Sequence, residues 1–143
     1  MTREEKPLDE ALLGAVAGRL GSLTMIDTVR VFPPQQPASV VATFDDVYYP
    51  DEVQRVLLEL RAFQNGDFNV TYREVWSRDG WMIRWDRHEN PHNARDHCHR
   101  PPHARKADAA DETFPEDFFD VVELILSEVD GRLGDVWNDV DSG

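Results

Sequence analysis

The chain has 143 residues, of which 28 are acidic and 15 basic, so its formal net charge at neutral pH is −13. This length predicts one domain, residues 1–143, with room for a hydrophobic core. The single cysteine cannot close an internal disulfide, and no run approaches the roughly 20 apolar residues of a membrane span. We therefore expect a cytoplasmic protein without a membrane segment or a signal sequence.

The charged residues are unusual in kind as well as in balance. Only Lys6 and Lys106 are lysines, which leaves 13 arginines among the 15 basic residues, and aspartates outnumber glutamates. An acidic surface of this type suits strong ionic screening, because dissolved salt relieves the repulsion between like charges. The composition therefore predicts a halophile's protein.

The first third of the chain predicts a helix and a hairpin. Leucine and valine recur every four residues over 8–20, which is typical of an amphipathic helix, and Gly21 ends it. Two β-prone runs follow, 23–32 and 39–49, and a proline-rich stretch, 33–37, separates them. Because proline cannot continue a sheet ladder, the two runs should pair as a hairpin.

A second helix is expected over residues 51–64. Asp51 can cap its first turn, and Asn65-Gly66 can end it. Its apolar residues form one stripe at helical spacing: Val53, Val56, Leu57 and Leu60.

Asp79-Gly80, between the β-prone runs 68–77 and 81–87, predicts a second hairpin, because an Asp-Gly pair is a preferred two-residue loop. With these two residues as the loop, the numbers of opposing residues add to 159. The pairs are then Trp76 with Ile83, Glu74 with Trp85 and Tyr72 with Arg87 on one face, and Val75 with Arg84, Arg73 with Asp86 and Thr71 with His88 on the other. The first face is expected in the core, which favours packing over base stacking for its tryptophans.

Residues 88–112 show no regular periodicity and contain three prolines, so we expect a long histidine-rich loop. After it, Thr113 and Glu116 suggest a capping box, and apolar residues over 118–133 trace one helical face. The ends of the chain, 1–7 and 138–143, are expected to be disordered.

Together these elements predict a single α+β domain with the order α-β-β-α-β-β-α. Two hairpins would form a four-stranded, mainly antiparallel sheet, and the helices would pack on it. The histidine-rich loop would then lie at the end of the second hairpin.

The most informative stretch is 88–103, which holds all five histidines and the one cysteine of the chain. Between Arg84 and Lys106 there are six basic and three acidic residues, which leaves 9 basic and 25 acidic ones elsewhere. Imidazole can exchange a proton near neutrality and can also bind a metal ion. A positive, proton-active region in an acidic protein favours binding of an anionic substrate.

A metal-independent ribonuclease is the first hypothesis for this region. An extended backbone would place His97 and His99 on one side, where two imidazoles can serve as acid and base on one phosphate. Asp86 can hold an imidazole in its productive tautomer. The candidate cations for the phosphate are Arg84, Arg73 and Arg100.

Other functions remain open on the same residues. A small zinc-binding domain would draw its ligands from His88, His92, His97, Cys98, His99 and His103, although no CxxC pair or HExxH helix occurs. A non-catalytic protein-binding module would use the loop or the polar sheet face. Cys98 as a nucleophile is disfavoured, because a reactive thiol needs a lowered pKa, and idle surface histidines are the structural alternative.

The run Ile83-Arg84-Trp85-Asp86, the loop with His92, the His97-Cys98-His99 triplet and the following helix resemble the TumE-like toxins of toxin–antitoxin modules, here in a haloarchaeal type of chain. The resemblance covers about 69–133. It implies a small toxin whose neighbouring gene encodes a neutralising antitoxin with a DNA-binding domain. The residues that match by position are Arg84, Asp86, His92, His97 and His99, whereas His88, His103 and Cys98 have no clear counterpart.

Overall fold

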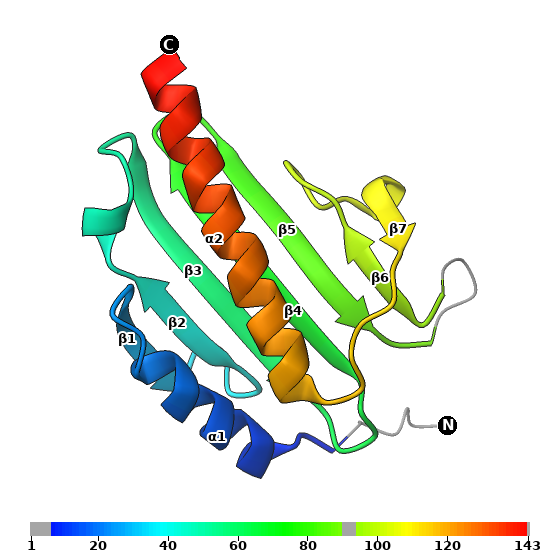
Figure 1. The fold of residues 1–143 in the computed structure, drawn as a ribbon. Helices are drawn as coiled ribbons and strands as arrows, with labels where there is room; N and C mark the ends of the chain where they lie inside the picture. Colours follow the sequence, from blue (N-terminus) through cyan, green and yellow to red (C-terminus); the bar gives the residue numbers. More distant parts are fainter. Residues whose placement is uncertain (1–6, 90–93, 143) are drawn as a thin grey trace.

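A computed structural model of the chain describes residues 7–89 and 94–142. In this part of the chain, seven strands form one antiparallel sheet in which each strand pairs with the next, in the order β1 to β7. Two α-helices flank them in the sequence (Figure 1). The elements are α1 (Glu10–Gly21), β1 (Ile26–Val31), β2 (Val40–Phe44), η1 (Asp46–Tyr48), β3 (Val53–Ala62), β4 (Phe68–Trp76), β5 (Gly80–Arg87), β6 (Asp96–His99), η2 (Lys106–Asp108), β7 (Ala109–Asp111) and α2 (Phe118–Ser142).

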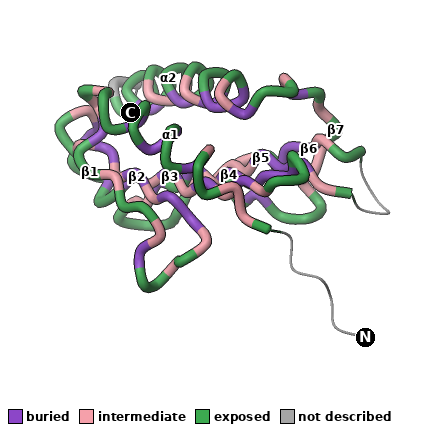
Figure 2. Tube along the Cα trace, turned by 90° about the horizontal axis from the view of Figure 1, so that it is seen from below, coloured by how far each residue is buried: buried purple, intermediate pink, exposed green. Residues whose placement is uncertain are grey.

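Both helices lie on the same face of the sheet. α2 runs across the central strands and α1 lies beside it over β1 and β2 (Figure 1), and the view along the sheet shows the helices as a layer above the strands (Figure 2). The core fills the space between the layers. Its largest buried side chains include Leu13 and Leu20 of α1, Leu58 of β3, Tyr72 of β4 and Ile125 of α2.

The predicted four-stranded sheet with three helices is wrong, because residues expected to form the middle helix form β3 instead. A bulge in β3 accounts for the misleading pattern. The pairing with β4 shifts between Val53 and Arg55, so two residues stand between Val53 and Val56 where a regular strand has one. Beyond the bulge the burial alternates strictly through Leu58, Leu60 and Ala62. The bulge thus produced an i, i+3 spacing that resembles a helix.

The second hairpin forms, but in a different register. Opposing residues add to 155 rather than 159, so Tyr72 faces Ile83 and Val70 faces Trp85. β4 ends at Trp76 and β5 begins at Gly80, so the loop comprises residues 77–79, and the Trp76 amide donates to the Asp79 carbonyl at 2.9 Å. This register lays apolar pairs under α2, where the predicted one would have put Glu74 against Trp85. The shift is an even number of residues, so every side chain keeps its predicted face.

The stretch expected to be one long loop contains two further strands. β6 and β7 extend the sheet beyond β5, and His97 and His99 therefore belong to a strand. Residues 90–93 lie outside the described residues, as does most of the expected disordered start, residues 1–6.

The first and last helices are confirmed, and the cap of the last one differs from the expected capping box. Asp9 caps α1 by accepting from the Leu12 amide at 3.1 Å. At α2, the Asp117 carboxylate accepts from the Phe119 amide at 2.9 Å, in place of the expected Thr113–Glu116 box. α2 continues to Ser142, so most of the expected disordered tail is helical backbone.

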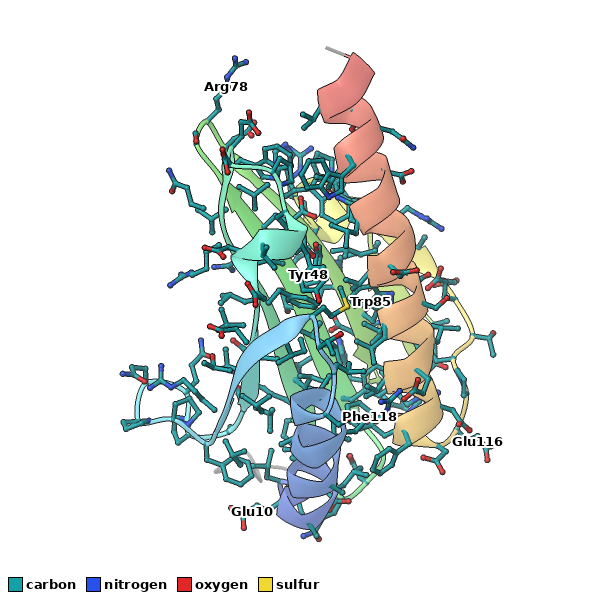
Figure 3. All side chains as sticks on the ribbon, turned by 60° about the vertical axis from the view of Figure 1, so that its left-hand side comes forward. Glu10, Tyr48, Arg78, Trp85, Glu116 and Phe118 are labelled. Atoms are coloured by element: carbon teal, nitrogen blue, oxygen red, sulfur yellow. The ribbon has the colours of Figure 1, made fainter. Side chains whose placement is uncertain are left out.

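Trp85 joins α2 to the centre of the sheet. Its indole nitrogen donates to Glu128 Oε2 at 2.6 Å, and Figure 3 shows the side chain between β5 and the helix. Neither described helix has a stretch long and apolar enough to cross a membrane.

Candidate active site on the open face of the sheet

The sheet face opposite the helices carries the polar side chains. Strand residues alternate between faces, and opposing residues on neighbouring strands share a face, so the pairings identify its members. From β1 to β7 the face includes Thr28, Arg30, Val41, Thr43, Arg55, Leu57, Glu59, Arg61, Asn69, Thr71, Arg73, Val75, Met82, Arg84, Asp86, His97, His99, Ala109 and Asp111. We call this surface the open face.

Charge is segregated between the two sides of the molecule. The open face carries five arginines and three carboxylates, Glu59, Asp86 and Asp111. α2 on the other side carries seven acidic residues and one basic residue, Arg132. The open face is therefore a basic surface on a protein whose net charge is −13.

At the β5–β6 end of this face, imidazoles and a guanidinium surround one carboxylate. Arg84 faces His99 and Asp86 faces His97 in the strand pairing. Asp86 Oδ2 lies 2.9 Å from Arg84 Nε, 3.1 Å from His99 Nε2 and 3.6 Å from His97 Nε2. His88, directly after β5, adds a third imidazole whose Nε2 lies 3.9 Å from the same oxygen. We call these five residues the Asp86 cluster.

The cluster has a buried part and an accessible part. Asp86, His97 and His99 are 2%, 1% and 4% exposed. The side chains of Arg84 and His88 are each more than a third exposed. A ligand can therefore reach the guanidinium of Arg84 and the ring of His88 directly, with the other groups behind them.

Backbone carbonyls fix the tautomer of all three imidazoles. The Nδ1 atoms of His97, His99 and His88 lie 3.0, 3.1 and 3.3 Å from the carbonyl oxygens of Ala94, Arg105 and Glu89. A carbonyl oxygen only accepts, so each Nδ1 carries the hydrogen and donates it. Each Nε2 then points its lone pair toward Asp86 when the ring is neutral.

The lone pair of His99 is satisfied, because Arg84 donates to His99 Nε2 at 3.0 Å. Asp86 has a further acceptor: its Oδ1 is buried and has no hydrogen-bond partner among the described residues. A buried carboxylate oxygen without a donor is costly in free energy. The cluster therefore has an unused capacity to hold a positive charge or a donor.

A shallow hollow opens onto the cluster from the open face. Its lining comprises Glu59, Arg61, Asn69, Thr71, Arg84, Asp86 and His88. The sequence analysis named His88 only as a possible zinc ligand and did not single out Arg61, Asn69 or Thr71 as site residues. Arg61 lies on β3, and Asn69 and Thr71 lie on β4. Alternation along the two strands would have placed all three on the face of Arg84 if β3 had been recognised as a strand.

The other predicted site residues lie in different places. Arg73 is exposed on the open face, with its guanidinium 3.7 Å from Met82 Sδ. Arg100 does not join the cluster and lies 4.0 Å from Glu112. His92 lies outside the described residues, and His103 lines a separate hollow with Trp81 at the far end of β5.

Cys98 lies on the helix side of β6, opposite the open face that carries His97 and His99. It is 2% exposed, and burial raises the pKa of its thiol to about 12. A thiol that stays protonated is a poor nucleophile and a poor metal ligand. Cys98 therefore packs in the core beside Trp85, its partner in the strand pairing.

A comparison with protein families matches residues 19–133 to a family described as Toxin TumE. The matched range runs from α1 into α2 and includes the whole Asp86 cluster and the open face. Comparisons with curated proteins and with solved structures gave no match.

Proposed function

The chain belongs to the TumE toxin family, and from this premise we propose that it acts as a toxin by cleaving RNA at the Asp86 cluster without a metal ion. The observation that carries the proposal is the position of the cluster. It opens into a hollow on the open face, where five arginines stand against three carboxylates in an acidic protein.

The open face suits a polyanion. Its arginines are spread over β1, β3, β4 and β5, so a nucleic-acid strand lying across the sheet would meet several guanidinium groups in succession. Such contacts supply affinity without sequence preference. Arg73, exposed beside the hollow, is assigned to this binding path, whereas Arg100 is left out because it pairs with Glu112.

In the hollow, a phosphodiester would bind to Arg84. Its guanidinium is partly exposed while its Nε is held by Asp86, so its direction is fixed before substrate arrives. A preorientated guanidinium stabilises negative charge as it develops on a phosphorane. Arg84 thus supplies the positive charge for which other nucleases use a metal ion.

His88 is the group placed to start the reaction. Its Nδ1 donates to the Glu89 carbonyl, so the Nε2 lone pair can accept a proton from a ribose 2′-hydroxyl. The freed 2′-oxygen bonds to phosphorus, the bond from phosphorus to the 5′-oxygen breaks, and that oxygen takes a proton from water. The products are a 2′,3′-cyclic phosphate and a 5′-hydroxyl, and His88 returns its proton to solvent.

His97, His99 and Asp86 act behind these two groups. Asp86 lies within 4 Å of His88 and stabilises its ring once it is protonated. His97 and His99 are almost fully buried, so they serve as positioning residues that hold Asp86 and Arg84 in place. His92, which lies outside the described residues, has no assigned step.

A cognate antitoxin protein is the expected partner. A protein that neutralises this toxin could do so by covering the open face. The arginines of that face would then contact acidic side chains of the antitoxin. The same surface would serve a non-catalytic binding module, and the assay below separates that function from RNA cleavage.

The test uses purified protein, a labelled single-stranded RNA and buffer containing EDTA. We expect cleavage to products with 2′,3′-cyclic ends and no cleavage of the same sequence made as DNA. His88→Ala and Arg84→Gln should each reduce the rate at least about 100-fold, as removal of a general base or an oxyanion donor does.

His103→Ala is the matched control, because His103 is an exposed histidine in a different hollow. It should cleave at the wild-type rate. Intact RNA with wild-type protein, both in dilute buffer and in molar salt, would refute the proposed reaction, and so would full activity of His88→Ala.

A further inference from the structure

We propose that Asp86, His88 and His97 form a zinc site, and that zinc bound there inhibits the toxin. The binding part stands on the geometry alone, and the inhibitory part rests on the function proposed above. One donor atom from each of the three residues lies within 4.8 Å of the other two.

The donor set matches zinc in kind. Two imidazole nitrogens and one carboxylate oxygen are the protein ligands of some catalytic zinc sites, in which water takes the fourth coordination position. Imidazole disfavours magnesium and calcium, which prefer oxygen ligands.

The orientation of the ligands is also set before a metal arrives. His97 donates through Nδ1 to the Ala94 carbonyl, and His88 does so to the Glu89 carbonyl. A metal-bound histidine typically donates its other ring nitrogen in this way, which directs the free lone pair at the ion. Here both Nε2 lone pairs face the same carboxylate.

Asp86 provides the independent indication of a missing cation. Its Oδ1 is buried and has no partner among the described residues, although Oδ2 is surrounded. The carboxylate oxygen nearest to the Nε2 atoms of His88 and His97 is Oδ2. A zinc ion bound by these two rings and Asp86 would add a positive charge to a carboxylate that lacks a donor at Oδ1 in the described part of the chain.

The site needs only a small adjustment to close on an ion. Tetrahedral zinc with bonds of about 2.0 Å holds its ligand atoms about 3.3 Å apart, so the widest separation must shrink by at most about 1.5 Å. His88 can supply most of this movement, because it follows β5 directly and its side chain is partly exposed.

Inhibition follows from the identity of the ligands. Zinc would occupy the Nε2 lone pair of His88, which the proposed reaction uses to accept the 2′-hydroxyl proton. It would also add a positive charge beside Arg84 and displace it from the phosphate position. One ion per chain is then sufficient to block the reaction.

The experiment titrates untagged, EDTA-dialysed protein with zinc chloride in competition with a chromogenic zinc indicator. Wild type should bind one zinc per chain with a Kd of micromolar or below. His88→Ala, and separately Asp86→Asn, should weaken binding at least about tenfold, while His103→Ala binds as wild type. Circular dichroism checks that each variant is folded, and Asp86→Asn keeps the shape of the side chain if His88→Ala unfolds.

The same samples are then assayed for RNA cleavage with and without one equivalent of zinc. Binding that depends on His88 and Asp86, together with loss of cleavage on adding zinc, supports both parts. Binding without cleavage under any condition supports the site and refutes the proposed function. Cleavage that requires zinc supports the site but refutes both inhibition and the metal-independent reaction. Absence of binding, or binding unchanged in His88→Ala and Asp86→Asn, refutes the site.

Discussion

Arg87 and Asp96 face each other across β5 and β6 as a doubly hydrogen-bonded ion pair, with nitrogen–oxygen distances of 2.7 and 2.9 Å. The pair lies on the helix side of the two strands that carry the Asp86 cluster on their other side. Arg87 also donates to the carbonyl oxygens of Phe114 and Pro115, and Asp96 accepts from the Phe114 amide. The pair thus fixes both the β5–β6 pairing and the segment that enters α2.

Removal of the Asp96 charge should destabilise the fold. Asp96→Asn leaves a buried guanidinium without its anion, and breaking such a pair costs about 3 kcal/mol. We expect a loss of this size in the free energy of unfolding at pH 7, measured by urea denaturation. A loss below about 0.5 kcal/mol would contradict the role given to the pair.

The cost of Asp96→Asn should depend on pH. The hydrogen bond from Arg87 is the main cause that lowers the pKa of Asp96 in the folded protein. A lowered folded pKa gives stability that is present above the unfolded pKa, about 4, and is lost as pH falls through the folded pKa. The difference between wild type and variant, measured by urea denaturation from pH 7 to pH 3, should therefore be constant down to about pH 4 and then shrink. A difference that stays constant from pH 7 to pH 3 would refute the linkage, because Asp96 of the unfolded wild type begins to bind a proton near pH 4 whatever the folded pKa is.

A second buried charge, Glu74, is tied to α2 by Arg132. The two guanidinium bonds measure 2.7 and 2.9 Å, and Tyr72 and Trp76 donate to the same carboxylate. Glu74 is fully buried, so Arg132→Met would leave its charge uncompensated and should cost about 3 kcal/mol in unfolding free energy.

The double variant Glu74→Gln with Arg132→Met tests the reason for that cost. Because it removes the uncompensated charge together with its partner, it should be more stable than Arg132→Met alone. Equal or lower stability of the double variant would mean that packing of Arg132 over the Trp81 ring, 3.9 Å from its centroid, dominates instead.

Local patterns predicted the elements that are locally regular. The first and last helices, the strands on either side of Asp79-Gly80 and the faces of their side chains follow from simple periodicity. β3 was missed because its bulge disguises a period of two, and β6 and β7 were missed because each has four residues or fewer. Such short strands depend on pairing with a neighbouring strand of the sheet, and the local pattern of a single sequence does not show that pairing.

The candidate site was predictable in membership but not in arrangement. Alternation put His97 and His99 on one side, and the structure brings both to Arg84 and Asp86. Which imidazole is accessible depends on burial by the Ala94 and Arg105 segments, a tertiary effect that the sequence leaves open. For that reason His88, which the sequence analysis named only as a possible zinc ligand, becomes the accessible imidazole.

Cys98 should be unreactive while the protein is folded. Burial raises the pKa of its thiol to about 12, so little thiolate is present at pH 8. We expect no labelling by a maleimide within an hour in native buffer and complete labelling in urea, both followed by mass spectrometry. Rapid stoichiometric labelling of the folded protein would show that β6 opens readily.

Salt should stabilise the protein through α2. Asp135 and Asp139 are exposed and one helical turn apart, near a C-terminal end where a negative charge also opposes the helix dipole. Salt screens such repulsion, with a Debye length of about 10 Å at 0.1 M and about 3 Å at 1 M. The melting temperature should therefore rise by several degrees from 0.1 to 1 M KCl. Asp135→Asn with Asp139→Asn should melt higher than wild type in 0.1 M KCl and gain less from added salt. An equal gain in both proteins would locate the salt effect elsewhere, and no gain in wild type would refute the adaptation to salt inferred from composition.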